Sequence, residues 1–254
     1  MTTPFIELID IHKRFDTNQV LDGVNLSVYQ GEITTVIGQS GTGKSVLLKH
    51  IIGLMQQDSG KILINGSPME QTDKKHKQEF YQQLSYMFQD NALFDFLTVY
   101  ENIALPLSEK KKLPEDKILE KVKRKLDMLG ISGIEDKYPS QLSGGMRKRV
   151  ALARALITDP KAVLFDEPTT GLDPVRKNNV HSMIAQYQKE FGFTAVIVSH
   201  DIPEIFDISQ HIAMLDQGKI IFQGNTDQIL DSHSDIVNAF ISGKEIKGQA
   251  TNAK

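Results

Sequence analysis

The sequence predicts an α/β fold with a parallel core sheet, preceded by an antiparallel β-subdomain and interrupted by a helical subdomain. Three apolar runs carry this prediction, at Ile33–Ile37, 162–165 and Thr194–Ser199. Strands of a parallel sheet are covered by helices on both faces, so they are apolar along their whole length. A helical pattern separates the last two runs, which is the order expected of parallel strands joined by a crossover helix.

The part of the chain before residue 38 is rich in short strand patterns. Apolar residues alternate with polar ones at Val24, Leu26 and Val28, which predicts an antiparallel sheet with one face toward the core. A second hairpin is predicted where the apolar run 61–64 meets Asn65 and Gly66, because this pair favours a tight turn between strands.

A helical insertion is predicted at about residues 90–160. Pro114 suits a helix start and Gly130 a helix end. Apolar residues recur between them on one predicted face: Ile118, Leu119, Val122, Leu126 and Leu129. We assign residues 1–241 to one domain that contains this insertion. Residues 242–254 are polar and aperiodic, which predicts a C-terminal tail.

The composition is that of a folded globular protein without the marks of secretion. The chain has 254 residues, of which 40% are hydrophobic, enough for a core. It has no cysteine, which excludes disulfides and thiolate chemistry and suits a reducing compartment. The formal net charge of -3 argues against a general nucleic-acid binder. Without a signal peptide or a membrane-spanning run, we expect a cytoplasmic protein that meets membranes only through partners.

The segment after the first core strand matches the phosphate-binding loop pattern G-x-x-x-x-G-K-[ST]. Its residues are Gly38, Gln39, Ser40, Gly41, Thr42, Gly43, Lys44 and Ser45. Glycines let backbone N–H groups converge on phosphate, and a helix predicted over 45–52 directs its positive end there. Lys44 would contact the β- and γ-phosphates and Ser45 would ligate Mg²⁺. The plainer alternative is a glycine-rich turn that contains a lysine.

Two acids end the apolar run 162–165. Asp166 is predicted to hold Mg²⁺, directly or through water, and Glu167 to orient a water for attack on the γ-phosphorus. Acids at a strand end also cap following elements, so this pair alone does not indicate a catalytic site. The functional interpretation depends on the phosphate-binding loop around Lys44. Together the two segments predict a nucleoside triphosphatase site.

A second anion-binding motif lies between these two segments. Ser143, Gly144 and Gly145 stand in the run Leu-Ser-Gly-Gly-Met, ahead of a helix predicted over 147–157. A single nucleotide does not need both anion sites. With this motif the chain resembles the ATP-binding-cassette (ABC) ATPases, which have a P-loop NTPase fold with a helical signature subdomain. These ATPases pair head to tail, so that the signature motif of one subunit closes over the ATP of the other.

The resemblance implies roles for four further residues. Phe15 would stack on adenine, although a core phenylalanine is equally compatible with the sequence. Gln89 would reach Mg²⁺ and sense a membrane partner, and Asp173 would contact the opposite subunit. His200 would form a hydrogen bond with the γ-phosphate. The alternative is a structural role, which is more common for an isolated histidine at a strand end. The implied catalytic residues are Lys44, Glu167 and His200, and the implied cofactors are ATP and Mg²⁺.

One departure from the common signature narrows the resemblance. Most ABC ATPases have glutamine at the fifth signature position, where this chain has Met146. With the segment after Gln89, this feature resembles the ATPases of Mla-type (MCE-associated) transporters, which implies phospholipid movement between inner and outer membranes. It also implies an ATPase homodimer, MlaE-like permease subunits, an MlaD-like MCE-domain protein and a small accessory subunit. The expected place is the cytoplasmic face of the bacterial inner membrane.

Three alternatives stay open. The first is an ABC importer ATPase for another small solute. The second is a soluble ABC ATPase of DNA repair, chromosome organisation or translation. The third is a non-catalytic regulatory cassette, but such cassettes commonly lack the acid or the histidine that are present here as Glu167 and His200.

The apolar residues Phe94, Phe96 and Leu97 are predicted to form part of a groove for a short helix of a membrane subunit, with ordinary core positions as the alternative.

Overall fold

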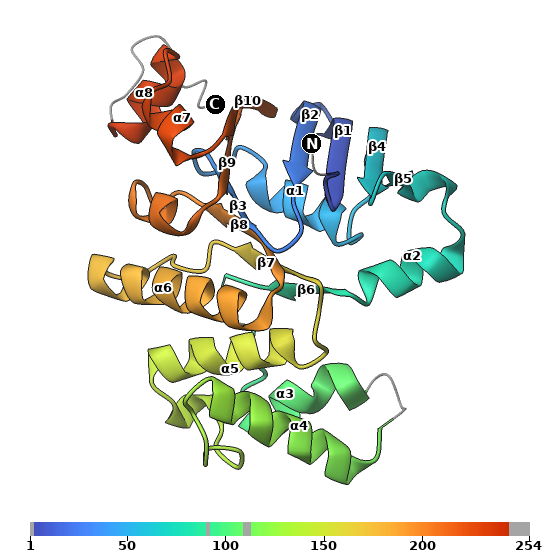
Figure 1. Ribbon diagram of the computed structural model, residues 1–254, viewed down its shortest axis with the longest axis vertical. Helices are drawn as coiled ribbons and strands as arrows, with labels where there is room; N and C mark the ends of the chain where they lie inside the picture. Colours follow the sequence, from blue (N-terminus) through green and yellow to red (C-terminus); the bar gives the residue numbers. More distant parts are fainter. Residues whose placement is uncertain (1–2, 90–91, 109–112, 244–254) are drawn as a thin grey trace.

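Two β-sheets organise the computed structural model, which describes residues 3–89, 92–108 and 113–243 (Figure 1). The antiparallel sheet consists, in order, of β2 (Asn18–Val28), β1 (Ile6–Phe15), β4 (Ser59–Ile64) and β5 (Ser67–Pro68). The larger sheet consists, in order, of β10 (Lys219–Gly224), β9 (His211–Asp216), β3 (Ile33–Ile37), β8 (Thr194–Ser199), β7 (Ala162–Asp166) and β6 (Leu84–Met87).

The inner strands of the larger sheet are parallel, and only β10 pairs antiparallel within it. Alternate residues of β7 and β8 enter two different hydrophobic cores. Phe165 and Ile197 belong to one core, whereas Leu164 and Val196 belong to the other. Both strands are therefore buried on both faces, which is why their sequences are apolar without alternation.

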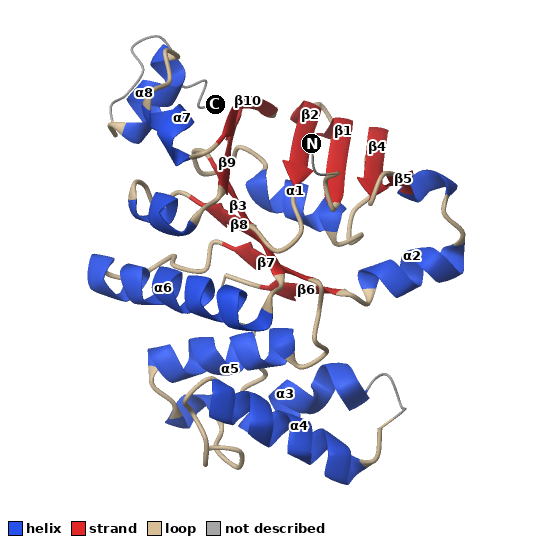
Figure 2. Cartoon of the chain, in the orientation of Figure 1, coloured by secondary structure: helices blue, strands red, loops and turns tan. Residues whose placement is uncertain are grey.

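Helices cover the larger sheet and extend beyond it (Figure 2). The α-helices of the described residues are α1 (Lys44–Ile51), α2 (Lys74–Tyr81), α3 (Val99–Ser108), α4 (Glu115–Met128), α5 (Gly144–Leu156), α6 (Pro174–Phe191), α7 (Thr226–Leu230) and α8 (Asp235–Ile241). Short 3₁₀ helices occupy Met69–Gln71, Pro139–Gln141 and Glu204–Ile208. The helices α3, α4 and α5 follow β6 in the chain and pack together at one end of the molecule, below α6 in Figure 1.

The predicted α/β fold with its parallel core sheet is confirmed, but some element details were wrong. The first helix begins at Lys44 and ends at Ile51, one residue earlier than expected at each end. The helix after the signature begins at Gly144, not at residue 147, because the Ser143 side chain caps it. Leu119 was expected on the buried face of α4 but is 37% exposed, since it follows Ile118 by a 100° turn of the helix.

The assignment of residues 1–241 to one domain and 242–254 to a tail stays a prediction. Residues 244–254 of that tail lie outside the described part of the chain, as do residues 90–91 at the start of the predicted insertion. In the described ranges, none of the helices combines the length and the apolar character needed to cross a lipid bilayer.

Candidate active site

The phosphate-binding loop joins the end of β3 to the start of α1, as the sequence predicted. Gly43 has φ 100° and is the N-cap of α1. A Cβ atom on Gly38 would lie 2.2 Å from the carbonyl oxygen of Leu215 in β9, so a larger residue would displace the loop from the sheet. The loop therefore sits against the carboxyl ends of the parallel strands with the α1 N-terminus facing it, an arrangement that suits phosphate.

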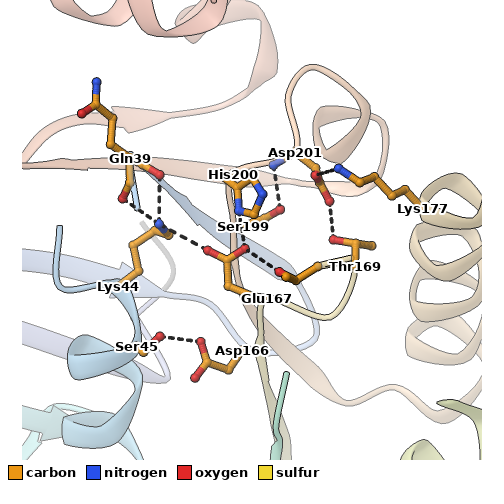
Figure 3. Close-up of polar contacts among 12 residues, drawn as sticks. Gln39, Lys44, Ser45, Asp166, Glu167, Thr169, Lys177, Ser199, His200 and Asp201 are labelled. Atoms are coloured by element: carbon orange, nitrogen blue, oxygen red, sulfur yellow. Dashed lines mark hydrogen bonds and ion pairs between the residues drawn. The ribbon is translucent and has the colours of Figure 1, made fainter. Parts of the chain in front are cut away.

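Lys44 is buried beneath this loop, with 5% of its surface exposed. Its ammonium donates to the carbonyl oxygens of Gly38 and Gln39, each at 2.9 Å, and lies 3.3 Å from a carboxylate oxygen of Glu167 (Figure 3). The charge is therefore held by the loop that would surround the phosphates and by the acid that follows β7. A phosphate bound in the loop would meet a cation whose position is already fixed.

Asp166 ends β7 and accepts two hydrogen bonds. The Ser45 hydroxyl donates to one carboxylate oxygen at 2.7 Å, and the Tyr86 hydroxyl donates to the other at 2.6 Å. Burial raises the pKa of Tyr86, and the neighbouring Asp166 raises it further, so the phenol stays protonated and acts as a donor.

Sequence reasoning missed this role of Tyr86. The parallel register pairs Tyr86 with Leu164, two residues before Asp166 on the same strand, and side chains two apart share a face. The sequence does show a tyrosine near the end of an apolar strand, but this signal could be used only by knowing that β6 pairs with the strand that carries the two acids.

Glu167 lies between Lys44 and His200. Its φ of 49° is unusual for a residue other than glycine and turns the chain sharply after β7. The His200 ring lies 2.5 Å from one carboxylate oxygen through Nδ1, and the Thr170 hydroxyl lies 3.4 Å from the same oxygen. The Glu167 amide donates to the carbonyl of Val198 at 3.1 Å, which joins this turn to β8. An acceptor, an imidazole and an ammonium thus converge at one point (Figure 3).

A cavity of about 420 Å³ gathers most of the predicted residues, although Gly38, Gln39, Thr42 and Asp166 are not part of its lining. Its lining is formed by Phe15, Val20, Ser40, Gly41, Gly43, Lys44, Ser45, Val46, Gln89, Glu167, Thr170 and His200. Phe15 is the last residue of β1 and is 42% exposed, so it is not a core residue and leaves an aromatic face open beside the loop.

The signature residues lie elsewhere. Among the described residues, the lining of the 420 Å³ cavity includes neither Ser143, Gly144 and Gly145 nor Asp173. The three signature residues line a second cavity of about 920 Å³, which shares Gln89 and Thr170 with the first. Ser143 caps α5 by accepting from the Met146 amide at 3.3 Å. Asp173 caps α6 by accepting from the Arg176 amide at 3.0 Å, so its visible role in one chain is structural.

Comparison with known proteins agrees with this geometry. The family described as ABC transporter matches residues 21–170, which span the phosphate-binding loop, the signature and the two acids. The chain belongs to the ABC transporter family. As a member of this family it binds ATP and hydrolyses it, and the alternative of a non-catalytic cassette is set aside.

Individual relatives of this ABC ATPase are similar over most of their length. The chain is 37% identical to the probable ribonucleotide transport ATP-binding protein mkl of Mycobacterium leprae, over 95% of this chain and 70% of that protein. It is 34% identical to the intermembrane phospholipid transport system ATP-binding protein MlaF of Haemophilus influenzae, over 96% of this chain and 92% of that protein. Both relatives are named as transport ATP-binding proteins, and the matched family is that of the ABC transporters, so the alternative of a soluble ABC ATPase of DNA repair, chromosome organisation or translation is not supported.

A solved structure shows the same fold. The dimeric ATP-binding cassette MJ0796, in a post-hydrolysis state with ADP and Pi bound, superposes with a TM-score of 0.75 at 28% identity. The superposition covers 87% of this chain and 98% of that one. The predicted ABC ATPase fold is therefore confirmed.

Glu167→Gln tests the role of the acid after β7 in this ABC ATPase. Glutamine keeps the shape of the side chain but accepts no proton, so we expect ATP binding to persist while turnover falls by about two to four orders of magnitude. ATPase rate and nucleotide affinity are measured on the same preparation. Glu79→Gln on α2, where the side chain is 52% exposed, is the matched control and should keep full activity. Near-normal turnover of Glu167→Gln would remove Glu167 from the proposed role.

Proposed function

We propose that this chain is the ATP-hydrolysing motor of a transporter that moves phospholipid between the inner and outer membranes of a bacterium. The observation that carries this proposal is the 34% identity to the phospholipid transport protein MlaF of Haemophilus influenzae over 92% of that protein. The Leu-Ser-Gly-Gly-Met signature and the apolar segment after Gln89 support it, because both lie where the sequence resembles the Mla-type ATPases.

The site residues take the following roles in this proposal. Phe15 stacks on adenine at the open edge of the cavity, and the loop 38–45 with Lys44 holds the phosphates. Glu167 orients the attacking water, and His200, 2.5 Å away, holds that carboxylate and reaches the γ-phosphate.

Mg²⁺ is the second proposed cofactor. The Ser45 hydroxyl and the Asp166 carboxylate lie 2.7 Å apart, and both are the hard oxygen donors that this ion prefers. Gln89 lines the 420 Å³ cavity together with Ser45 and would supply an amide oxygen. When bound, the ion neutralises charge on the β- and γ-phosphates.

An apolar groove on the helical side suits the predicted docking of a membrane subunit. The groove has a volume of about 270 Å³ and is lined by Ser85, Tyr86, Phe88, Ala92, Phe94, Leu105, Pro106, Arg154 and Ala155. Of the three residues predicted for this groove, Phe94 lines it, whereas Phe96 and Leu97 are not part of its described lining. Phe94 is 42% exposed and Phe96 is 75% exposed, so neither is an ordinary core residue. We infer that this groove receives a short helix of an MlaE-like permease subunit.

Asn102 holds the edge of this groove. Its buried side chain accepts from the Phe94 amide at 2.8 Å and donates to the carbonyls of Phe94, Leu97 and Thr98 at 3.0 to 3.1 Å. The backbone around Phe94 is therefore fixed independently of its ring.

An MlaD-like MCE-domain protein and a small accessory subunit complete the proposed assembly, which would place the ATPase on the cytoplasmic face of the inner membrane.

Transport of another small solute is the second candidate. The M. leprae relative at 37% identity carries the name of a probable ribonucleotide transport ATP-binding protein, and cargo is chosen by subunits other than the ATPase.

Purification of the native complex distinguishes phospholipid transport from transport of another small solute. We expect a permease and an MCE-domain protein to copurify with bound phospholipid, identified by mass spectrometry of the extracted complex. A soluble solute-binding protein in place of the MCE partner, with no lipid, would contradict the phospholipid proposal.

The separation of the two anion sites predicts hydrolysis by a head-to-tail dimer. Subunits with Lys44→Ala are mixed with subunits with Ser143→Arg, each inactive as a homodimer. In the mixed dimer one composite site has both defects and the other has neither, so ATPase activity should return, to about a quarter of wild type after statistical exchange. An exchange control with either variant alone should stay inactive. If the mixture also stays inactive although mixed dimers form, Ser143 does not act on the neighbouring nucleotide.

The groove predicts that a charge at Phe94 uncouples hydrolysis from transport. Phe94→Glu places a carboxylate among apolar anchors, while Asn102 still fixes the backbone, so we expect a folded ATPase that no longer copurifies with the permease. Leu230→Glu on α7, at a residue 53% exposed and outside the groove lining, is the matched control. Thermal stability and copurification are measured together. Full partner binding and transport by a folded Phe94→Glu variant would rule out docking here.

A further inference from the structure

Asp201, the residue after His200, has a buried carboxylate with two strong donors. The Thr169 hydroxyl donates to one of its oxygens and the Lys177 ammonium donates to the other (Figure 3). The Asp201 amide donates to the Ser199 hydroxyl at 3.0 Å, which fixes the start of the loop after β8. Asp201 lies outside the lining of the 420 Å³ cavity.

Thr169 belongs to the loop after β7, two residues beyond Glu167, and is fully buried. The neighbouring residue Pro168 is held by α5, because the Lys148 ammonium on that helix donates to the Pro168 carbonyl at 2.6 Å. The Thr170 amide then donates back to the Glu167 carbonyl at 3.2 Å. The backbone that orients Glu167 is thus tied to α5 through Lys148 and to the His200 loop through Asp201.

The charges around Asp201 favour its ionised form. Burial alone would raise the pKa of Asp201, but the hydrogen bonds from Lys177 and Thr169 outweigh burial and hold that pKa below its usual value. His181 on α6 faces the same carboxylate, with Nε2 3.9 Å from its oxygen. Burial lowers the pKa of His181, although Asp201, Glu204 and Asp207 act in the opposite direction. Lys177 is therefore the cation that balances Asp201 at neutral pH.

We propose that Asp201 is a positioning residue for ATP hydrolysis, which fixes the loop carrying Glu167 relative to the loop carrying His200 through its hydrogen bond from Thr169. The proposal rests on the roles proposed above for Glu167 and His200. These two side chains are in direct contact at 2.5 Å, so a small shift between their loops separates them. Misplacing a reacting group by about 1 Å costs roughly a hundredfold in rate.

Two single substitutions test this link in the full chain with Glu167 and His200 intact. Asp201→Asn keeps the shape and removes the charge, whereas Thr169→Val removes only the buried hydroxyl. Each should lower kcat for ATP at least about tenfold while KM and nucleotide affinity change less than about twofold, because positioning acts on the transition state and not on ATP binding. Thr169→Ser retains the hydroxyl and should restore most of the lost kcat.

Asp159→Asn is the matched control for the loss of a carboxylate paired with lysine. Asp159 pairs with Lys125 at 3.1 Å and Lys121 at 3.4 Å, away from the nucleotide cavity, and its φ of 50° suits asparagine. Its kcat should equal that of wild type. Thermal unfolding is measured for every variant, so that kcat is expressed per folded molecule.

Several outcomes would overturn the proposal. Wild-type kcat in folded Asp201→Asn or Thr169→Val, with only a lower melting temperature, would show a structural role alone. An equal loss in Thr169→Ser and Thr169→Val would show that the hydroxyl is not the link. If Asp201→Asn fails to fold, the comparison of kcat between Thr169→Val and Thr169→Ser decides whether the Thr169 hydroxyl is the link. Failure of Glu167→Gln to lose turnover is a separate result, which would overturn the role of Glu167 itself whatever Asp201 does.

Discussion

The whole active site depends on the parallel pairing of β3, β8 and β7. In this register Ile37 pairs with Ser199, and Asp166 pairs with Val198, so the three strands end at the same edge of the sheet. The phosphate-binding loop, the acidic turn and the His200 loop therefore start side by side. A slip of one residue between two strands would turn every side chain to the other face and would take Asp166 away from Ser45. Such a slip would also move the side chains of the slipped strand from one hydrophobic core to the other, for example Phe165 into the core that now holds Leu164.

Much of the site could be predicted from the sequence because its parts are local. A glycine loop between an apolar strand and a helix, an apolar strand ending in two acids, and a serine before two glycines are each continuous stretches of the chain. Local geometry decides how each stretch folds, and the parallel pairing of β3, β8 and β7 then brings Lys44, Glu167 and His200 to one cavity. The roles of Phe15, Gln89, Asp173 and His200 rested on resemblance. Phe15, Gln89 and His200 do line the cavity, whereas Asp173 caps its own helix in the single chain.

Three of the residues that sequence reasoning missed, Tyr86, Thr169 and Lys177, have partners far away in the chain. Tyr86 reaches Asp166 from a strand 80 residues earlier. Thr169 meets Asp201 because the loops after β7 and β8 leave neighbouring strands, and Lys177 reaches the same carboxylate from α6. Asn102 acts locally, because its side chain bonds backbone groups of the loop directly before it and of the start of its own helix. Each of these side chains is a hydrogen-bond donor or acceptor that replaces water for a buried partner, and nothing in its local sequence shows which partner that is.

The contacts of Lys148 bear on how the two anion sites are connected within one chain. Lys148 stands on α5, the helix that Ser143 caps, and is largely buried, with 8% of its surface exposed. Its hydrogen bond to the Pro168 carbonyl joins the signature helix to the turn that holds Glu167, and the shared lining residues Gln89 and Thr170 join the two cavities. In the proposed dimer, a nucleotide at the signature of one subunit would lie at the N-terminus of the helix whose Lys148 holds that subunit's own turn with Glu167. Thr170 lines both cavities and Leu172 lines the larger one, so the loop after Glu167 contacts both sites within one chain.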